Sequence, residues 1–183
     1  MASVLIPLAQ GCEELEAVTI IDLMRRAGIE VVTASLTDEP IKASRGTVLI
    51  ADTTLDKALQ REYDMMVLPG GLPGADHLNA DARIQHTLQT MAKHNKYTAA
   101  ICAAPKVLAT AGLLEGKRAT SFPGVLEQLN LPATQLESAA VVKDGNVITS
   151  RGPGTAMDFA LELIALLAGE SKRQEVEAAL QRH

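Results

Sequence analysis

The hydrophobic positions along the chain form short continuous runs that alternate with stretches of helical spacing. The runs at residues 4–8, 29–35, 65–68 and 97–101 are typical of strands that are buried on both faces of a sheet. Residues 13–27 instead place apolar side chains at helical spacing, and the glycine that follows suits a helix C-terminus. Strands that alternate with helices predict an α/β fold, with a mostly parallel sheet between helical layers and right-handed crossovers.

The second half of the chain continues the alternation and adds a hairpin. Residues 139–142 and 147–150 flank the sequence KDGN, which is a strong signal for an antiparallel hairpin at a sheet edge. The pattern also predicts short strands within 41–51 and 118–121, short helices at 55–60 and 124–129, helices at 82–94, 107–111 and 155–168, and a last helix capped by Ser171 that ends near Gln181. No internal repeat, low-complexity segment or linker interrupts the chain, so we expect a single domain over residues 1–183.

Composition narrows the class of protein. Hydrophobic residues make up 47% of the chain but aromatic residues only 2%, so Ala, Val, Leu and Ile must build the core. The net charge of −5 argues against a nucleic-acid or anionic-membrane surface, and no apolar run approaches the length of a membrane span. The two cysteines form no disulfide framework, and the chain begins directly with a strand pattern. We therefore expect a small cytoplasmic protein without a nucleic-acid or membrane partner.

Cys102 stands where a strand pattern gives way to a helix pattern. Two alanines follow it, and Pro105 suits the first position of a helix. Such a tight strand-to-helix turn resembles the elbow on which many hydrolases carry their nucleophile. A helix N-terminus also favours the thiolate over the thiol. The alternative is that Cys102 is a small, inert hydrophobic residue of the core.

Glu16 is a second candidate because of its place on the predicted helix 13–27. Glu16 lies one helical turn before Ile20 on the apolar face of this helix. A carboxylate is unexpected at such a position unless it is paired or protonated. The alternative is an exposed first-turn glutamate that complements the helix dipole.

Four irregular segments follow predicted strands, at residues 11–16, 69–74, 102–105 and 151–154. Ligands bind outside the carboxyl ends of the strands in open α/β sheets, so a parallel sheet brings at least the first three segments to one edge. A thiol, a carboxyl group and a glycine-rich turn then share one site. The backbone N–H groups of Gly71 and Ala103 are candidates to stabilise a developing oxyanion there.

The histidines and cysteines do not support two other kinds of site. None of His77, His86, His94 and His183 lies in a strand-end loop beside Cys102, which weakens the interpretation as a Cys–His protease. Two cysteines far apart in the sequence and scattered histidines match no metal-ligand spacing, so we expect no metal.

Five motifs, GCEELEAV, SRG, VLPGGLPGA, AAICAAP and TSRGPGT, occur in this order over nearly the whole chain. Together they resemble the ThiJ/PfpI superfamily, and most closely a bacterial-type member of its DJ-one branch. The resemblance implies a flavodoxin-like three-layer α/β sandwich and a homodimer. It also implies that Cys102 is strained, reactive and easily oxidised to the sulfinic acid, and that a protonated Glu16 hydrogen-bonds to its sulfur.

The same resemblance assigns roles to further residues. It places the lining of an anion pocket at Gly70, Gly71 and Ala103, and at Arg45 on a loop that faces a partner subunit. Arg26 and Asp158 match positions that pair structurally, which implies a stabilising role. One position departs from the pattern, because Phe122 in TSFP stands where several members carry a histidine with an acid/base role.

The leading hypothesis is a cysteine-dependent, cofactor-free enzyme of the glyoxalase or deglycase type. Cys102 adds to an aldehyde of methylglyoxal or glyoxal, or attacks an early glycation adduct of an amine, and Glu16 moves the proton. The alternative is a non-catalytic redox sensor or redox-regulated chaperone for oxidative stress, with Cys12 as a candidate resolving thiol. The absent histidine favours this alternative. A role in a thiamine pathway has no phosphate-binding feature to support it.

Overall fold

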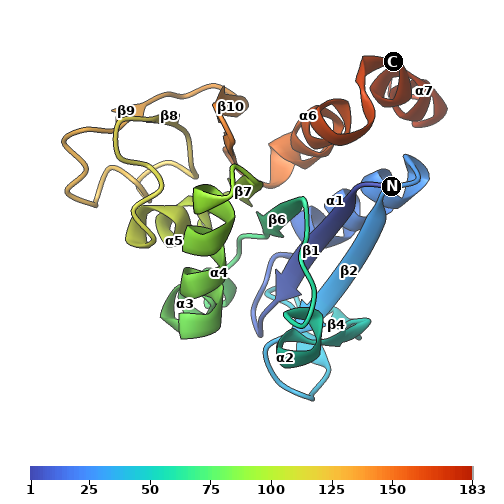
Figure 1. Ribbon diagram of the computed structural model, residues 1–183, viewed down its shortest axis with the longest axis horizontal. Coiled ribbons are helices and arrows are strands. Elements are labelled where there is room, and N and C mark those ends of the chain that lie inside the picture. The colour runs from blue at the N-terminus through green and yellow to red at the C-terminus, as the bar shows by residue number, and fades with distance from the viewer. Residues whose placement is uncertain (183) are drawn as a thin grey trace.

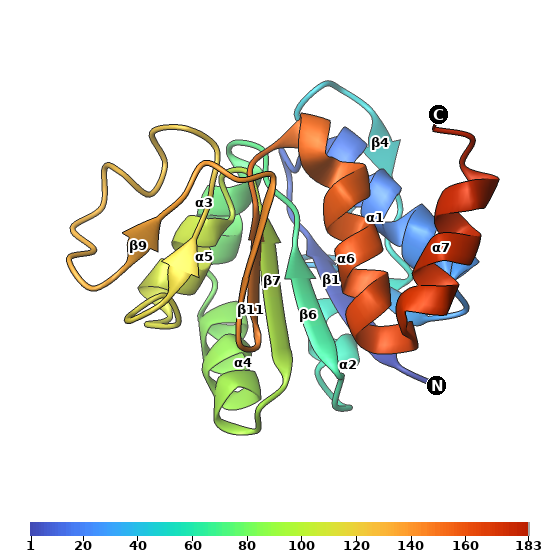
Figure 2. The same ribbon diagram turned by 90° about the horizontal axis from the view of Figure 1, so that it is seen from above.

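A seven-stranded sheet forms the centre of the computed structural model, which describes residues 1–182 (Figures 1 and 2). Its strands stand in the order β10-β11-β7-β6-β1-β2-β5. They are β1 (Ser3–Leu8), β2 (Glu30–Ser35), β5 (Thr53–Thr54), β6 (Met65–Leu68), β7 (Tyr97–Ile101), β10 (Val141–Asp144) and β11 (Val147–Ser150). Neighbouring strands are parallel, except that β10 and β11 form an antiparallel hairpin at one edge. The predicted flavodoxin-like α/β fold with an added edge hairpin is confirmed.

Helices cover both faces of this sheet, as Figure 2 shows most clearly. On one face lie α1 (Glu14–Arg26), α6 (Ala156–Ala168) and α7 (Glu170–Ala179), and on the other α2 (Leu55–Ala58), α3 (Gly74–Ala80), α4 (Ala82–Lys93) and α5 (Pro105–Thr110). Each face has its own hydrophobic core, which Ala, Val, Leu, Ile and Met build almost alone. The prediction that aliphatic residues must build the core is therefore confirmed, and Phe159 is the one phenylalanine in it.

Two short strand pairs lie outside the central sheet. β3 (Ile41–Lys42) and β4 (Val48–Leu49) are antiparallel, and the loop between them carries Arg45. β8 (Arg118–Ala119) and β9 (Gln135–Leu136) are parallel, and the long excursion between them begins near Phe122. A single 3-10 turn, Pro153–Thr155, connects β11 to α6. These segments surround the carboxyl edge of the sheet.

Three local expectations differ from the structure. Residues 124–129 form turns instead of a helix, because Gly124 takes a φ of +88°, which interrupts helical geometry at its first residue. Ser171 lies inside α7 and is not its cap, since the helix starts one residue earlier, directly after Gly169. The pattern did not indicate α3, whose first residue, Gly74, belongs to the glycine-rich turn.

The expected pairing of Arg26 with Asp158 is wrong within this chain. Arg26 donates from Nε to Asp22 Oδ2 at 2.6 Å, one turn back on α1. Asp158 on α6 instead accepts from Nη2 of Arg182 at 2.8 Å. Each group finds an opposite charge on its own helix or on the C-terminal segment packed beside it. Exposed pairs of this kind contribute at most about 1 kcal/mol to stability.

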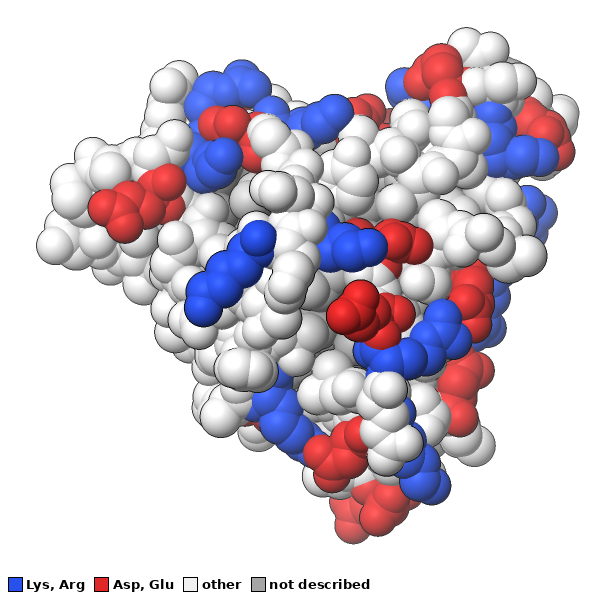
Figure 3. Space-filling view, viewed as in Figure 1, with Lys and Arg blue, Asp and Glu red and all other residues white. Residues whose placement is uncertain are grey.

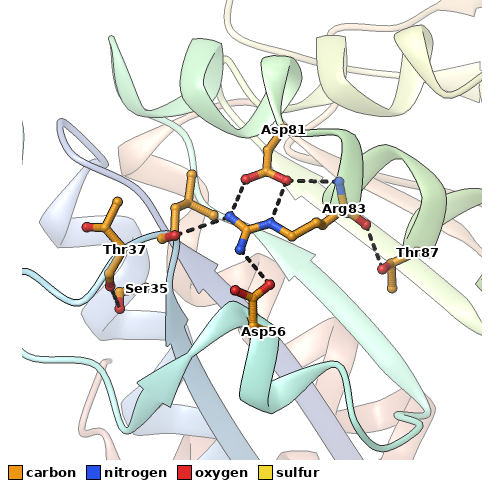
Figure 4. A network of polar contacts seen from close by, with 7 residues as sticks. Ser35, Thr37, Asp56, Asp81, Arg83 and Thr87 are labelled. Carbon is orange, nitrogen blue, oxygen red and sulfur yellow. Dashed lines mark hydrogen bonds and ion pairs between the residues drawn. The ribbon is translucent and has the colours of Figure 1, made fainter.

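A partly exposed arginine network ties three segments together on the α2–α5 face of the sheet (Figure 4). Asp81 caps the first turn of α4 by accepting the backbone N–H of Arg83, and its carboxylate also binds the Arg83 guanidinium at 2.6 Å. Arg83 further donates to Asp56 on α2 and to the carbonyl of Leu36 after β2. The Arg83 guanidinium lowers the pKa of Asp81. This network holds α2 and α4 in place and lies away from Cys102.

The charge distribution shows no single basic surface on the face drawn in Figure 3, where Lys and Arg side chains are interspersed with Asp and Glu. Within residues 1–182, no helix has both the length and the apolar character that crossing a membrane requires. The same residues contain no cluster of three His, Cys, Asp or Glu side chains arranged to hold a metal ion.

Candidate active site

Cys102 occupies the tight turn between β7 and α5. Its φ is +65°, a left-handed conformation that costs a non-glycine residue roughly 1–3 kcal/mol unless its surroundings impose it. Two hydrogen bonds impose it here: the Cys102 N–H donates to the carbonyl of Ser150 at 3.0 Å, and the Cys102 carbonyl accepts the N–H of Phe122 at 2.8 Å. The predicted elbow is present, and it is fixed by the last residue of β11 and by the segment that follows β8.

Glu16 lies in the first turn of α1 and is completely buried. Its Oε2 accepts the backbone N–H of Gly70 at 2.8 Å. Its Oε1 is also buried and has no hydrogen-bond partner among residues 1–182. The alternative of an exposed glutamate at the helix dipole is therefore wrong, and the position on the apolar stripe predicted the burial correctly.

Gly70 brings Glu16 and Cys102 together. A Cβ atom at residue 70 would lie 2.6 Å from Cβ of Cys102 and 2.8 Å from Oε2 of Glu16, so any side chain there would separate them. Gly71 is restricted as well, because its φ is +87° and an added Cβ would lie 2.3 Å from the backbone nitrogen of Glu13. The glycine-rich turn after β6 thus allows close approach of backbone to both candidate groups.

The two ionisable groups of the site affect each other. Burial raises the pKa of Glu16 to about 7, while the N–H of Gly70 and the nearby thiol of Cys102 act in the opposite direction. Burial and the negative charge of Glu16 raise the pKa of Cys102 to about 12, against the lowering effect of the N–H groups of Gly71 and Ala103. The thiolate that the helix N-terminus was expected to favour is therefore disfavoured while Glu16 is charged. Protonation of Glu16 removes that repulsion, so the pair titrates as a unit.

Arg45 does not reach this centre within the single chain. Its side chain is 80% exposed, and its Nε lies 3.9 Å from the carboxylate of Glu13. Its backbone N–H donates to Glu14, which anchors the β3–β4 loop to the start of α1. An exposed guanidinium beside α1 remains available to a neighbouring molecule.

Glu13 is a residue that the sequence analysis did not single out. It is 9% exposed, its N–H donates to the carbonyl of Gly70 at 2.9 Å, and its Oε2 accepts the hydroxyl of Ser44 at 2.9 Å. Glu13 therefore links the glycine turn to the β3–β4 loop. Its position at the N-cap of α1, three residues before Glu16, was the available signal.

The other cysteine and the histidines lie outside the thiol–carboxyl pair. Cys12 is free and buried, and burial raises its pKa to about 11. His77 is exposed on α3, His86 is exposed on α4 and His94 is exposed directly after α4, while His183 lies outside the described residues. A cleft of about 340 Å³ adjoins His86 and His94, but it opens along α4 and the loop before β6, at the opposite ends of the strands from Cys102.

Comparison with known proteins places this geometry in a family. The DJ-1/PfpI family model matches residues 2–166. The chain is 43% identical over 179 residues to Protein dj-1beta of Drosophila melanogaster, which is 97% of this chain and 96% of that protein. The chain belongs to the DJ-1/PfpI family.

Other relatives differ in length and in what they are named for. Protein DJ-1 homolog B of Arabidopsis thaliana is 43% identical over 96% of this chain, but the match spans only 40% of that longer protein. The glutathione-independent glyoxalase DJR-1.2 of Caenorhabditis elegans is 33% identical, over 93% of this chain and 90% of its own length.

Solved structures of the DJ-1/PfpI family agree with the fold throughout. The crystal structure of Drosophila melanogaster DJ-1beta matches with a TM-score of 0.94 and 41% identity, covering 98% of this chain and 97% of that one. The structure of oxidized Toxoplasma gondii DJ-1 matches with a TM-score of 0.93 and 38% identity, covering 98% of each chain.

Proposed function

We propose that this protein is a cofactor-free thiol enzyme of the glyoxalase or deglycase type, acting on methylglyoxal, glyoxal or early glycation adducts. The observation that carries the proposal is the buried Oε1 of Glu16, which has no partner in the described chain and belongs to a carboxyl group packed against the strained Cys102. The glyoxalase name of the Caenorhabditis elegans relative supports the same reaction class.

The reaction begins with the Cys102 thiol beside the Glu16 carboxylate, and Oε1 of Glu16 takes the thiol proton as the sulfur attacks. The sulfur attacks the aldehyde carbon of methylglyoxal, the carbonyl electron pair moves to oxygen, and Glu16 protonates that oxygen to give a hemithioacetal. The Glu16 carboxylate then removes the hydrogen from the same carbon, which forms an enediolate, and returns it to the neighbouring carbon. A second proton passes from the first hydroxyl to the enolate oxygen, giving the thioester of lactic acid. Water cleaves this thioester to lactate and restores the thiol.

The backbone stabilises the negative charge that develops on oxygen. The N–H groups of Gly71 and Ala103 act on the Cys102 sulfur, and are close enough to lower its pKa. They are therefore placed to donate to an oxyanion formed on the carbon that the sulfur attacks. Phe122 supplies no proton at the position where the resemblance to the DJ-one branch implies a histidine in several members, so Glu16 is the proton carrier of this site.

The test is lactate formation from methylglyoxal without glutathione, by wild type and by Cys102→Ser. Turnover by wild type that disappears in the variant supports the proposal. Deglycation of a glycated amine is measured with the same two proteins. Equal lactate formation by wild type, variant and buffer would overturn the enzyme assignment.

A redox sensor or redox-regulated chaperone is the second candidate, and the strained φ of +65° at Cys102 with Phe122 in place of histidine favours it. In that role the sulfur attacks hydrogen peroxide, an S–O bond forms as the O–O bond breaks, and water leaves with the proton of Glu16. A second equivalent of peroxide gives the sulfinic acid in the same way. The oxidized state named for the Toxoplasma gondii relative supports such chemistry.

We also propose a second copy of this chain as the partner, and two free cysteines suit a reducing cytoplasm. Leu15 and Val18 on α1 are 51% and 47% exposed, and Val48 and Ile50 on and after β4 are 62% and 85% exposed. Glu14 joins these two segments through hydrogen bonds to the β3–β4 loop. The resulting apolar surface includes the segment that carries Arg45, which a dimer would direct toward the neighbouring subunit.

A further inference from the structure

A cleft of about 270 Å³ lies between the loop after β8 and the turn after β11, and one of its lining residues, Phe122, hydrogen-bonds through its backbone to the proposed nucleophile. Phe122 and Pro123 line it from the first segment, and Arg151, Gly152 and Pro153 line it from the second. None of these side chains takes part in the proton transfers proposed above. The cleft is a surface, joined to the Cys102 peptide through Phe122, that the thiol chemistry leaves unused.

The backbone of Phe122 is fixed relative to Cys102. Its N–H donates to the Cys102 carbonyl at 2.8 Å, and its own carbonyl accepts the Ser121 hydroxyl and the Val125 N–H, each at 3.0 Å. The aromatic ring therefore projects from a position set by the nucleophile's own peptide group. Binding to a surface that is already ordered loses little conformational entropy.

The ring of Phe122 forms one wall of the cleft. A Cβ atom at Gly152 would lie only 3.3 Å from Cδ2 of the ring, so the ring packs directly against the bare backbone there. Phe122 is nevertheless 49% exposed. A half-exposed aromatic ring flanked by prolines offers an apolar surface on which another ring stacks favourably.

Arg151 brings a positive charge to the same cleft. Its backbone N–H donates to the Ala140 carbonyl, and Nη1 donates to the Ser138 carbonyl at 2.6 Å. No carboxylate within residues 1–182 forms an ion pair with it, and the nearby Glu137 pairs with Arg118. The remaining guanidinium donors of Arg151 suit a carboxylate, which they bind in a planar fork.

We propose that this cleft is the subsite for the substituent of the dicarbonyl, and that it selects 2-oxoaldehydes carrying an aromatic ring with an acidic group. The aldehyde carbon lies at Cys102, the ring packs on Phe122, and the acidic group binds Arg151. This assignment rests on the proposed thiol chemistry for the position of the aldehyde. Methylglyoxal, with only a methyl substituent, leaves most of the cleft empty.

The first experiment compares initial rates with methylglyoxal, phenylglyoxal and 4-carboxyphenylglyoxal. Wild type is expected to show a higher kcat/KM for phenylglyoxal than for methylglyoxal. Phe122→Ala is expected to lower the ratio of these two kcat/KM values roughly tenfold. Arg151→Gln is expected to lower the ratio of kcat/KM for 4-carboxyphenylglyoxal to kcat/KM for phenylglyoxal by a similar factor. Leu129→Ala, an exposed apolar residue of the same excursion, and Lys143→Gln, an exposed cation on β10, are matched controls that keep both ratios.

The second experiment needs no turnover. Mandelate and lactate, the products of phenylglyoxal and methylglyoxal, are compared for protection of Cys102 against iodoacetamide. Mandelate is expected to protect wild type at a concentration roughly tenfold lower than lactate, and this advantage disappears in Phe122→Ala. If no glyoxal is turned over but the advantage of mandelate is seen, the proposed function fails and the subsite stands. Unchanged rate ratios in both variants together with equal protection by the two acids would overturn the subsite.

Discussion

Gly70 makes the two carboxyl oxygens of Glu16 inequivalent. Oε2 accepts the Gly70 N–H at 2.8 Å, whereas Oε1 is buried without a partner in the described chain. The backbone therefore occupies one oxygen permanently and leaves the other to hold a proton. Since a side chain at residue 70 would enter the space between Glu16 and Cys102, the same glycine fixes the carboxyl group and admits the sulfur.

Replacing Glu16 by glutamine tests the proton carrier. The amide oxygen keeps the hydrogen bond from Gly70, so the fold is expected to persist, but the amide neither gives nor takes a proton at neutral pH. Loss of general acid–base catalysis lowers kcat/KM for methylglyoxal by roughly 100-fold or more. Glu115→Gln, which changes an exposed carboxylate, is the control and is expected to match wild type. Full activity of the Glu16 variant would remove Glu16 from the mechanism.

The raised pKa of Glu16 makes the stability of the protein depend on pH. The carboxyl group ionises near 4.5 in the unfolded chain but only near 7 in the folded protein. Between these values the folded state binds more protons, so stability falls as the pH rises from 4.5 through 7, in total by on the order of 3 kcal/mol. Urea unfolding at pH 5 and pH 8 is expected to show this loss in wild type and not in Glu16→Gln. Equal pH dependence in both proteins would show that the carboxyl group is not buried as described.

A methyl group at residue 70 is expected to damage both stability and reactivity. In Gly70→Ala the new Cβ would lie 2.6 Å from Cβ of Cys102, and the elbow must shift. Such overpacking typically costs about 1–3 kcal/mol, and thermal unfolding together with the rate of iodoacetamide labelling of Cys102 measures the two effects. Gly154→Ala is the control, because its Cβ would meet nothing within 4 Å. Similar behaviour of the two variants would contradict the role given to Gly70.

The sequence predicted the parts of the fold and site that depend on periodicity. The continuous apolar runs located the buried strands, and helical spacing placed Glu16 on the apolar face of α1, where the structure finds it buried. The strand-to-helix break at Cys102 likewise predicted the elbow. Each of these features depends on local spacing, which a single sequence displays directly.

Other features depend on contacts between distant segments and have no local signal. The pKa of Cys102 is raised because burial and the charge of Glu16 outweigh the backbone N–H groups, and no pattern reports that balance. Arg83 binds Asp56 on another helix, 27 residues away in the sequence. The helix expected at 124–129 fails because Gly124 takes a positive φ within a long excursion whose path the sequence does not indicate.

Mild peroxide treatment is expected to oxidise Cys102 and leave Cys12 unchanged. The pKa of both thiols is raised, so access and the neighbouring acid decide the order. Cys102 is only partly buried and has a protonatable Glu16 beside it, whereas Cys12 is buried. Peptide mass spectrometry should therefore find two added oxygens on the Cys102 peptide before any change at Cys12. In Glu16→Gln the oxidation is expected to slow, since the thiolate loses its proton-bearing neighbour. Methionine oxidation without a change at Cys102 would count against the redox sensor, and a bridge between the two cysteines would restore Cys12 as a resolving thiol.

The apolar surface on α1 and β4 predicts a dimer that a single charge disrupts. Val18 and Val48 are both about half exposed or more, and a carboxylate introduced at either would be buried against a neighbouring copy without a partner. Val18→Asp and Val48→Asp are therefore expected to sediment as monomers of 19.4 kDa at concentrations where wild type is a dimer. Leu72→Asp, at a residue 57% exposed on the glycine-rich turn, is the control and should keep the mass of wild type. If wild type itself sediments as a monomer over the whole concentration range, the proposed homodimer is wrong, and Arg45 then has no neighbouring subunit to face.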